Sequence, residues 1–280
     1  MTPTQNPAIG RTIRAGSVTT NYHDMGEGVP VLMLHGSGVG VSAYANWNDT
    51  LPFFARSFRA VAMDVAGFGY SDAAEDATYG LDLWVRHVVD FLDVMGFDKV
   101  HLLGNSFGGA LALAVTIRHP DRVRRAALMG SVGLRFEMPK SFNAGVGFDG
   151  KRDQMRSLLE NFTVEPSSIT EEMIDLRYNT SIRPGYDEVF KKLFPGPREQ
   201  KMNALLSSEN DIARIRNDVL VLHGREDRVI PVETSVRLSS LIPRSELHVF
   251  SNCGHWSHRD KAERFNGVVS EFFNAPGANA

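Results

Sequence analysis

The sequence predicts an α/β protein with a mostly parallel β-sheet, helices on both faces, an N-terminal antiparallel hairpin and an inserted helical segment. Short runs rich in β-branched residues alternate with longer segments of helical periodicity. These runs begin near Val29, Arg59, Lys99, Arg124, Asp218 and Glu246. Because the runs are almost continuously apolar, we expect strands that are buried on both faces of a parallel sheet.

The segments around these runs fit the same fold. Residues 11–28 (RTIRAGSVTTNYHDMGEG) predict two strands joined at Gly16 and Ser17, a hairpin on the sheet edge. Helical patterns predict helices over residues 106–117, 231–240 and 262–273. A further helix is indicated by apolar residues at helical spacing that end before a glycine: Leu81, Trp84, Val85, Val88, Leu92, Met95 and Gly96.

The alternation stops between about Leu134 and Ser208, where helical patterns occur without a convincing strand. We interpret this segment as a helical cap inserted into a core domain. The expected organisation is therefore a core of residues 1–133 and 209–280 with a cap of residues 134–208.

Composition excludes several classes of protein. The chain has 280 residues, with 30 Lys and Arg against 33 Asp and Glu. The resulting net charge of -3 gives no broad positive field that would attract the phosphates of a nucleic acid. Cys253 is the single cysteine, which excludes an internal disulfide and suits a reducing compartment. With neither a leader-like N-terminus nor an apolar run of membrane-spanning length, we expect a soluble cytoplasmic protein with no membrane partner.

Ser106 lies in the stretch LLGNSFGGALAL, which matches the pattern G-x-S-x-G between a predicted strand and a predicted helix. Gly104 and Gly108 permit a strained strand-to-helix turn that presents the serine hydroxyl at a helix N-terminus. The backbone amide of Phe107 can then stabilise an oxyanion. The pentapeptide alone is a weak signal, because serine is also a good helix N-cap.

A nucleophilic serine needs a base and an orienting acid, which follow it in the chain order serine, acid, histidine in such folds. Asp227 follows the strand VLVLHG, and His255 follows the strand LHVF. Both therefore lie beyond the carboxyl ends of strands, at the edge where Ser106 is expected. Glu226 is the alternative acid and His258 the alternative base.

The glycine-rich stretch LHGSGVG, residues 34–40, follows another predicted strand. Gly38, Gly40 and Asp64 loosely fit a dinucleotide-binding fingerprint, but Pro52 interrupts the required helix and the acid lies too far along the chain. We therefore expect neither a cofactor nor a metal. The better interpretation is that this loop supplies a second oxyanion-hole amide, from Ser37.

These residues resemble the α/β-hydrolase superfamily, and within it the meta-cleavage product hydrolases, which cleave a carbon–carbon bond in ring-fission products of catechols. The resemblance covers nearly the whole chain and is closest to the hydrolases of 2-hydroxymuconic semialdehyde and its alkyl relatives. It implies an α/β-hydrolase fold, a homo-oligomer of at least two subunits and a small dienoate substrate. The segments that carry it are HGSGVGVSAYANW, DVAGFGYSD, GNSFGGALAL, RHPDRVRR, LRYNTSIRPG, LFPGPR, HGREDRVIP and LHVFSNCGHW.

The resemblance also implies roles for individual residues. Val39 is a departure, since the family's glycine loop usually has proline there, but no catalytic group is lost. The implied catalytic triad is Ser106, Asp227 and His255, and the implied oxyanion-hole donors are the amides of Ser37 and Phe107. The residues implied to hold the substrate's carboxylate and dienol are Asn46, Asn105, Arg177 and Trp256.

The sequence itself supports part of the role implied for Arg177. Ser168 and Glu171 form a capping-box pattern that predicts a helix start, and apolar residues bracket Arg177 on one arc of that helix. A guanidinium on an apolar arc is unfavourable unless it meets an anion. The alternative is a salt bridge to an acid of the core. Arg183 is the competing cation, but the following Pro-Gly places it in a turn.

The predicted activity is therefore hydrolysis of a carbon–carbon bond in 2-hydroxy-6-oxohexa-2,4-dienoate compounds. The triad alone would also permit an ordinary carboxylesterase. A third interpretation is a ligand receptor that retains the triad and signals through movement of the cap.

Overall fold

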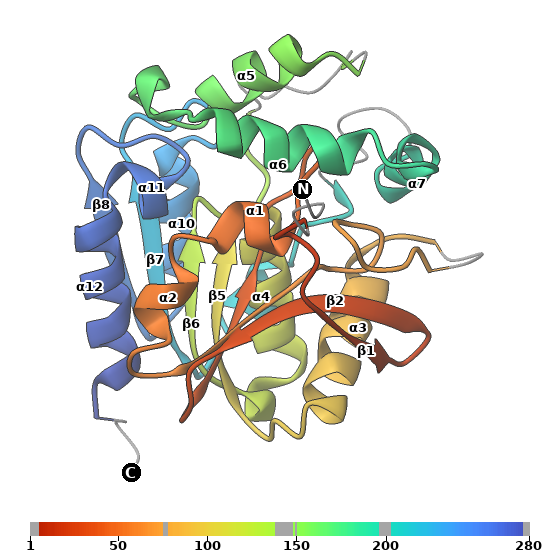
Figure 1. Cartoon of the computed structure of the whole chain (residues 1–280). Coiled ribbons are helices and arrows are strands. Elements are labelled where there is room, and N and C mark those ends of the chain that lie inside the picture. The colour runs from red at the N-terminus through yellow and green to blue at the C-terminus, as the bar shows by residue number, and fades with distance from the viewer. Residues whose placement is uncertain (1–5, 75–77, 138–147, 149, 196–202, 277–280) are drawn as a thin grey trace.

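A computed structural model of the chain describes residues 6–74, 78–137, 148, 150–195 and 203–276. Its sheet has eight strands in the order β1-β2-β4-β3-β5-β6-β7-β8 (Figure 1). The strands are β1 (Arg11–Ala15), β2 (Val18–Met25), β3 (Pro30–Leu34), β4 (Arg59–Met63), β5 (Val100–Asn105), β6 (Val123–Met129), β7 (Asp218–Gly224) and β8 (Ser245–Phe250).

The N-terminal hairpin forms the edge of this sheet. β1 pairs antiparallel with β2, and β2 pairs antiparallel with β4, whereas the neighbours from β4 to β8 are parallel. Gly16 has a φ of 57°, the left-handed conformation that a tight turn between β1 and β2 requires. The predicted sheet with its antiparallel edge is confirmed.

The helices lie on both faces of the sheet and at one end of it. Those in the described part of the chain are α1 (Ala43–Trp47), α2 (Leu51–Phe54), α3 (Leu81–Val94), α4 (Phe107–Arg118), α5 (Arg152–Glu160), α6 (Glu171–Ser181), α7 (Tyr186–Leu193), α9 (Glu209–Ile212), α10 (Val232–Leu241), α11 (Ser257–Asp260) and α12 (Ala262–Asn274). Short 3-10 turns cover Pro120–Arg122 and Pro166–Ser168. None of these helices is long and apolar enough to cross a bilayer.

Alternation along the central strands produces two hydrophobic layers. Leu32 and Leu34 of β3 belong to a cluster that includes buried side chains of α3, α4 and α10. Val31 and Met33 point to the other face and belong to a cluster with α1, α2 and α12. Because successive side chains of a strand point to opposite faces, both faces of β3 are buried, as the apolar strand sequences predict.

The segment between β6 and β7 carries α5, α6 and α7, which lie together above the sheet in Figure 1. Parts of this segment, residues 138–147, 149 and 196–202, lie outside the described residues. Its connection to the rest of the fold includes the amide of Trp256, which donates to the Phe162 carbonyl at 2.9 Å. The site described below lies beneath these helices.

The predicted start of α6 is wrong by two residues. Ser168 ends a 3-10 turn, and the helix N-cap is Thr170, whose hydroxyl accepts from the Met173 amide at 3.3 Å. Thr170 and Met173 fulfil the same spacing rule as the predicted Ser168 and Glu171. The sequence pattern alone could not rank these two overlapping caps.

Candidate active site

Ser106 occupies a strained turn between β5 and α4. Its φ of 55° lies in the left-handed region, which is unusual for a residue other than glycine. The Ser106 amide donates to the Met129 carbonyl at 2.8 Å, and the Ser106 carbonyl accepts from the Val132 amide at 3.3 Å. The helix begins at Phe107, one residue after the predicted start, and the serine side chain does not cap it. The turn therefore holds Ser106 for a purpose other than helix capping.

The flanking glycines allow the backbone to pack closely around this turn. A β-carbon on Gly108 would clash with the carbonyl oxygen of Leu34, and one on Gly104 would clash with that of Gly108. The first turn of α4 is therefore packed against the carboxyl end of β3. Since Ser37 follows β3 closely, the two proposed amide donors, Ser37 and Phe107, lie on adjacent segments.

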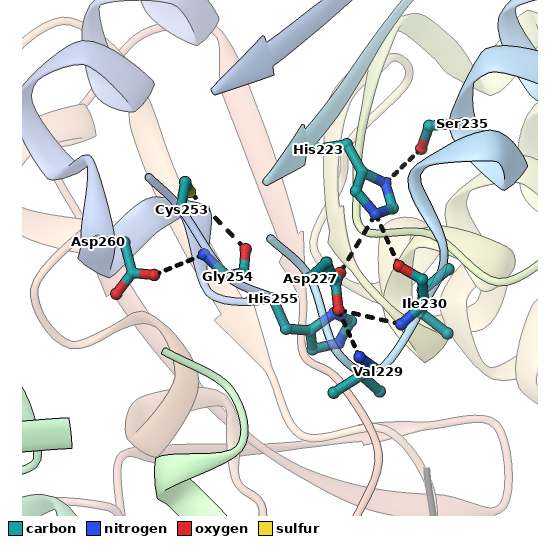
Figure 2. A network of polar contacts seen from close by, with 9 residues as sticks. All are labelled: His223, Asp227, Val229, Ile230, Ser235, Cys253, Gly254, His255 and Asp260. Carbon is teal, nitrogen blue, oxygen red and sulfur yellow. Dashed lines mark hydrogen bonds and ion pairs between the residues drawn. The ribbon is translucent and has the colours of Figure 1, made fainter. Parts of the chain in front are cut away.

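Asp227 and His255 come from the loops after β7 and β8 and are in direct contact (Figure 2). His255 Nδ1 lies 2.7 Å from Asp227 Oδ2, a hydrogen-bond distance. Both side chains are almost fully buried. This geometry fixes the imidazole ring with Nδ1 toward the acid and leaves Nε2 as the nitrogen available to a nucleophile.

The carboxylate of Asp227 is surrounded by donors. Oδ1 accepts from the amides of Val229 and Ile230 at 2.7 and 3.0 Å. Oδ2 lies 3.3 Å from His223 Nε2, and His223 Nδ1 lies 2.6 Å from Ser235 Oγ (Figure 2). Burial alone would raise the pKa of Asp227, but the His255 and His223 rings more than offset it and hold this pKa well below the ordinary value. We call His223, Asp227, Ser235 and His255 the acid cluster.

The His255 ring lies beside Gly130, next to the strand end that supports the serine turn. Gly130 directly follows Met129, whose carbonyl accepts from the Ser106 amide. A β-carbon on Gly130 would lie 3.1 Å from His255 Nδ1 and 3.4 Å from Asp227 Oδ2. The acid cluster and the serine turn thus share Gly130 as a neighbour. No hydrogen bond between Ser106 Oγ and His255 is formed within the described part of the chain, and such catalytic bonds often tighten only when substrate binds.

The alternative acid and base are engaged elsewhere. Glu226 is half-exposed, accepts from the Cys253 amide at 2.9 Å and pairs with Arg225. His258 lies on α11, and its Nε2 donates to the backbone carbonyl of Asn46 at 2.9 Å. Burial lowers the pKa of His258 well below its ordinary value, so this ring is held neutral.

Asn46 and Asn105 meet at Gly36, in the loop that follows β3. The Gly36 amide donates to Asn46 Oδ1 at 3.0 Å. A β-carbon on Gly36 would lie 2.9 Å from Asn105 Oδ1. Both asparagines are buried, and neither Nδ2 donor has a hydrogen-bond partner among the described residues.

Arg177 reaches the same glycine loop from α6. Its side chain is 4 % exposed, and neither Nε nor Nη2 has a partner among the described residues. A β-carbon on Gly38 would lie 3.2 Å from Arg177 Nη2. Burial lowers the pKa of Arg177 to about 10, and within the described residues it forms no salt bridge to a core acid. We call Asn46, Asn105 and Arg177 the donor cluster.

The competing cation Arg183 lies farther out. Its guanidinium stacks over the Tyr70 ring at 4.3 Å, and it lines a cleft of about 380 Å³ between the turn at residues 67–73 and the start of α7. Trp256 packs against Phe162, with ring centroids 4.9 Å apart, and belongs to an apolar cluster made mostly of side chains from the segment between β6 and β7. Its contacts therefore favour packing over direct substrate binding.

The residues that loosely fitted a dinucleotide fingerprint are used otherwise. Asp64 is fully buried and accepts hydrogen bonds from the amides of Ala43 and Tyr70 and from Asn21. Burial raises the pKa of Asp64 to about 6. These contacts leave no carboxylate oxygen for a ribose hydroxyl. Among the residues that the structure describes, no group of three or more His, Cys, Asp and Glu is arranged to hold a metal ion.

Sequence reasoning missed two side chains near the site. The strand sequence alone marks His223 as a buried strand residue, although its position four residues before Asp227, across a strand end, is a signal that could have been used. No sequence pattern marks Tyr186, because its hydrogen-bond partner is the backbone of the glycine loop, 146 positions away in the chain.

Comparison with known proteins gives consistent matches. The Alpha/beta hydrolase family matches residues 31–268. The chain is 46% identical to a 2-hydroxy-6-oxo-2,4-heptadienoate hydrolase of Pseudomonas putida, covering 96% of this chain and 98% of that one. It is 45% identical to a 2-hydroxymuconate semialdehyde hydrolase of Pseudomonas sp. (strain CF600), covering 99% and 98%. A solved serine mutant of the meta-cleavage product hydrolase from Pseudomonas fluorescens IP01, complexed with acetates, has a TM-score of 0.92, 46% identity and coverage of 95% and 98%.

Proposed function

This chain belongs to the alpha/beta hydrolase family and, within it, to the meta-cleavage product hydrolases, and on that premise we propose that it cleaves 2-hydroxy-6-oxohexa-2,4-dienoates. Its substrate would be 2-hydroxymuconic semialdehyde or a 6-alkyl analogue. Water breaks the bond between C5 and C6, and the products are 2-hydroxypenta-2,4-dienoate and the carboxylic acid derived from C6.

The first step is ketonisation of the dienol. The hydroxyl proton at C2 is lost, a proton is gained at C5, and the C2 oxygen becomes a carbonyl. Arg177 binds the carboxylate at C1, and the Nδ2 donors of Asn46 and Asn105 bond the oxygens at this end. These contacts stabilise the anion formed when the C2 hydroxyl loses its proton and, in the second step, the dienolate that leaves from C6. Ketonisation is needed because C5 must leave as a carbanion that is delocalised onto the C2 carbonyl.

The second step is hydrolysis at C6. Ser106 Oγ, or a water activated by His255, adds to the C6 carbonyl while His255 accepts the proton. The amides of Ser37 and Phe107 stabilise the resulting oxyanion, and Asp227 stabilises the imidazolium. Collapse breaks the C5–C6 bond, the electron pair moves onto the dienolate, and a proton completes the hydroxydienoate product. If Ser106 was the nucleophile, a water activated by His255 then hydrolyses the ester between Ser106 and the acyl group, which releases the carboxylic acid and restores the serine.

The observation that carries this proposal is the donor cluster. It consists of buried polar donors without partners around one glycine loop beside Ser106. An unpartnered buried donor costs about 1–3 kcal/mol of stability, more when it is charged. Other buried polar atoms among the described residues also lack partners, but here three side chains converge on one loop beside Ser106, and a shared ligand accounts for all of them. A small molecule with a carboxylate next to a hydroxyl or carbonyl oxygen matches these donors, whereas a neutral ester leaves the guanidinium unpaired.

The test compares two substrates in one variant. Arg177→Ala should lower kcat/KM for the dienoate on the order of 100-fold or more, because a buried charge pair is lost, and should leave a neutral p-nitrophenyl ester little affected. Arg183→Gln is the matched control, since it removes a nearby cation outside the donor cluster. Equal losses on dienoate and ester in Arg177→Ala would contradict the role of Arg177 and favour an ordinary carboxylesterase.

A direct assay tests the activity itself. The purified protein should bleach a yellow dienolate ring-fission product in the presence of a chelator and without added nucleotide. Substrates with hydrogen, methyl, isopropyl and phenyl at C6 would define the acyl preference. Absence of turnover on all of them, with tight dienoate binding retained, would instead support a receptor.

We propose further that residues 134–208 act as the cap over this site and that the chain works in the cytoplasm as a homo-oligomer of at least two subunits. Apolar packing of Trp256 against side chains of α5, α6 and α7 supports the cap. A single, buried cysteine supports a reducing compartment. Light scattering after size exclusion tests the oligomeric state, and a monomer at micromolar concentration would contradict it.

A further inference from the structure

The glycine loop that follows β3 has few hydrogen bonds of its own. Gly38 and Gly40 have φ values of 127° and 69°, which only glycine adopts readily. Within the loop, the Val41 amide approaches the Gly38 carbonyl at a long 3.4 Å. Position 39 is valine, whose φ is not fixed by a ring as that of proline would be. The conformation of this loop therefore depends on contacts from outside it.

Tyr186, the first residue of α7, provides such a contact. Its hydroxyl oxygen accepts from the Gly40 amide at 2.6 Å, and its hydroxyl group faces the Gly38 carbonyl at 3.5 Å. The side chain is 5 % exposed, and burial raises the pKa of Tyr186 to about 12, so the phenol keeps its proton. Gly185, with a φ of 77°, forms the turn that aims α7 at the loop.

The rest of the loop is enclosed by the same cap helices. A β-carbon on Gly40 would clash with the carbonyl oxygen of Arg177 on α6. Val39 and Tyr186 belong to one apolar cluster, and the Tyr186 ring stacks on Phe190 with centroids 5.7 Å apart. The ring of Tyr186 is thus held by packing, while its hydroxyl alone bonds the loop backbone.

The loop matters to the chemistry because it carries Ser37, one of the amide donors assigned to the oxyanion hole. A donor of this kind stabilises the transition state only when it is directed at the developing charge. We infer that Tyr186 is a positioning residue whose hydroxyl holds the glycine loop with the Ser37 amide facing Ser106. The oxyanion hole is then complete only when α7 is docked on the core. The expected effect on the dienoate rests on the proposed function. The expected effect on a neutral ester requires only that Ser106 is a reactive serine.

The test uses Tyr186→Phe, which removes the hydroxyl and keeps the ring. We expect kcat to fall about 10- to 100-fold, less than the loss from deleting a donor outright, on the dienoate and on a neutral ester alike, with KM little changed. Phenylboronic acid, which forms a tetrahedral adduct on a reactive serine, should bind more weakly by a similar factor. Tyr178→Phe is the matched control, because within the described residues the Tyr178 hydroxyl bonds nothing, and it should match the parent protein in each assay.

Thermal unfolding of both variants separates positioning from general damage. A parallel fall in kcat and boronic acid affinity with the unfolding midpoint close to that of Tyr178→Phe supports the inference. Unchanged kcat, a loss confined to KM, or a loss on the dienoate alone would overturn it. If the protein turned over no dienoate at all, the proposed function would fail, while the ester and boronic acid measurements would still decide the role of Tyr186.

Discussion

The acid cluster and the donor cluster flank the same serine turn, but they differ in how their polar atoms are satisfied. Both oxygens of Asp227 contact donors, and the His223 ring behind it contacts Ser235 and the Ile230 carbonyl. In the donor cluster, Nδ2 of both asparagines and Nε and Nη2 of Arg177 lack partners among the described residues. One side is complete in the free protein, whereas the other leaves donors that the proposed anionic substrate would complete. The first is therefore suited to catalysis and the second to recognition.

Breaking the acid cluster should have the largest effect. Asp227→Asn keeps the shape of the side chain but favours the wrong imidazole tautomer of His255, so kcat should fall on the order of 10⁴-fold. Because this side serves the chemistry of any acyl substrate, dienoate and neutral ester should lose activity together. Steady-state kinetics on both substrates checks this, and a loss restricted to the dienoate would remove the distinction between the clusters.

Removing one neutral donor should have a smaller and selective effect. Asn105→Ala deletes a buried donor expected to bond a substrate oxygen, which corresponds to about a 10- to 100-fold loss of kcat/KM on the dienoate. The ester should be less affected, since it has no oxygen at that position. If kcat/KM fell further on the ester than on the dienoate, Asn105 would act on the serine turn rather than on the substrate.

The two clusters should respond in opposite directions when stability is measured. Arg177→Met replaces an unpaired buried charge by an apolar side chain of similar length and should raise the free energy of unfolding by about 1–3 kcal/mol. His223→Phe leaves the buried carboxylate of Asp227 with one donor fewer and should lower the free energy of unfolding by about 1–3 kcal/mol. Urea unfolding of both variants tests the pair, and a destabilised Arg177→Met would show that Arg177 is satisfied in the free protein.

The smallest expected effect is in the pH dependence of stability. The folded-state pKa of Asp227 is lowered, so its contribution is present above the unfolded value near about 3.9 and is lost as pH falls toward the folded value. For one group, the slope is at most about 1.4 kcal/mol per pH unit. Unfolding measured from pH 5 to pH 3 should therefore be less pH-dependent in Asp227→Asn than in the parent protein. Identical slopes would indicate that the carboxylate is not specially stabilised.

Sequence reasoning predicted the residues of the acid side from local rules, and the structure brings Asp227 and His255 into contact. Asp227 and His255 could be selected because each follows an apolar strand, and the carboxyl ends of parallel strands share one edge of the sheet. Ser106 could be selected because its glycines mark a strained turn between a strand and a helix. These features depend on residues close in the chain, which is why strand and turn patterns suffice.

Other features depend on contacts that no local pattern encodes. Tyr186 bonds a loop 146 positions away, and Trp256 packs on Phe162, which lies in the segment between β6 and β7. The start of α6 was misjudged because Ser168 and Thr170 are both acceptable N-caps, and the preceding 3-10 turn decides between them. Asn46, Asn105 and Arg177 were identified through resemblance, since their shared position around Gly36 and Gly38 exists only in the folded chain.

The central claim is that the donor cluster is completed by the carboxylate end of a dienoate. Its most direct measurement is the dissociation constant of the coloured dienoate for Ser106→Ala, in which the substrate is bound without being cleaved, compared with Ser106→Ala combined with Arg177→Met. The account predicts binding weaker on the order of 100-fold in the double variant, since a buried charged contact is lost. Equal dissociation constants in the two proteins would contradict it.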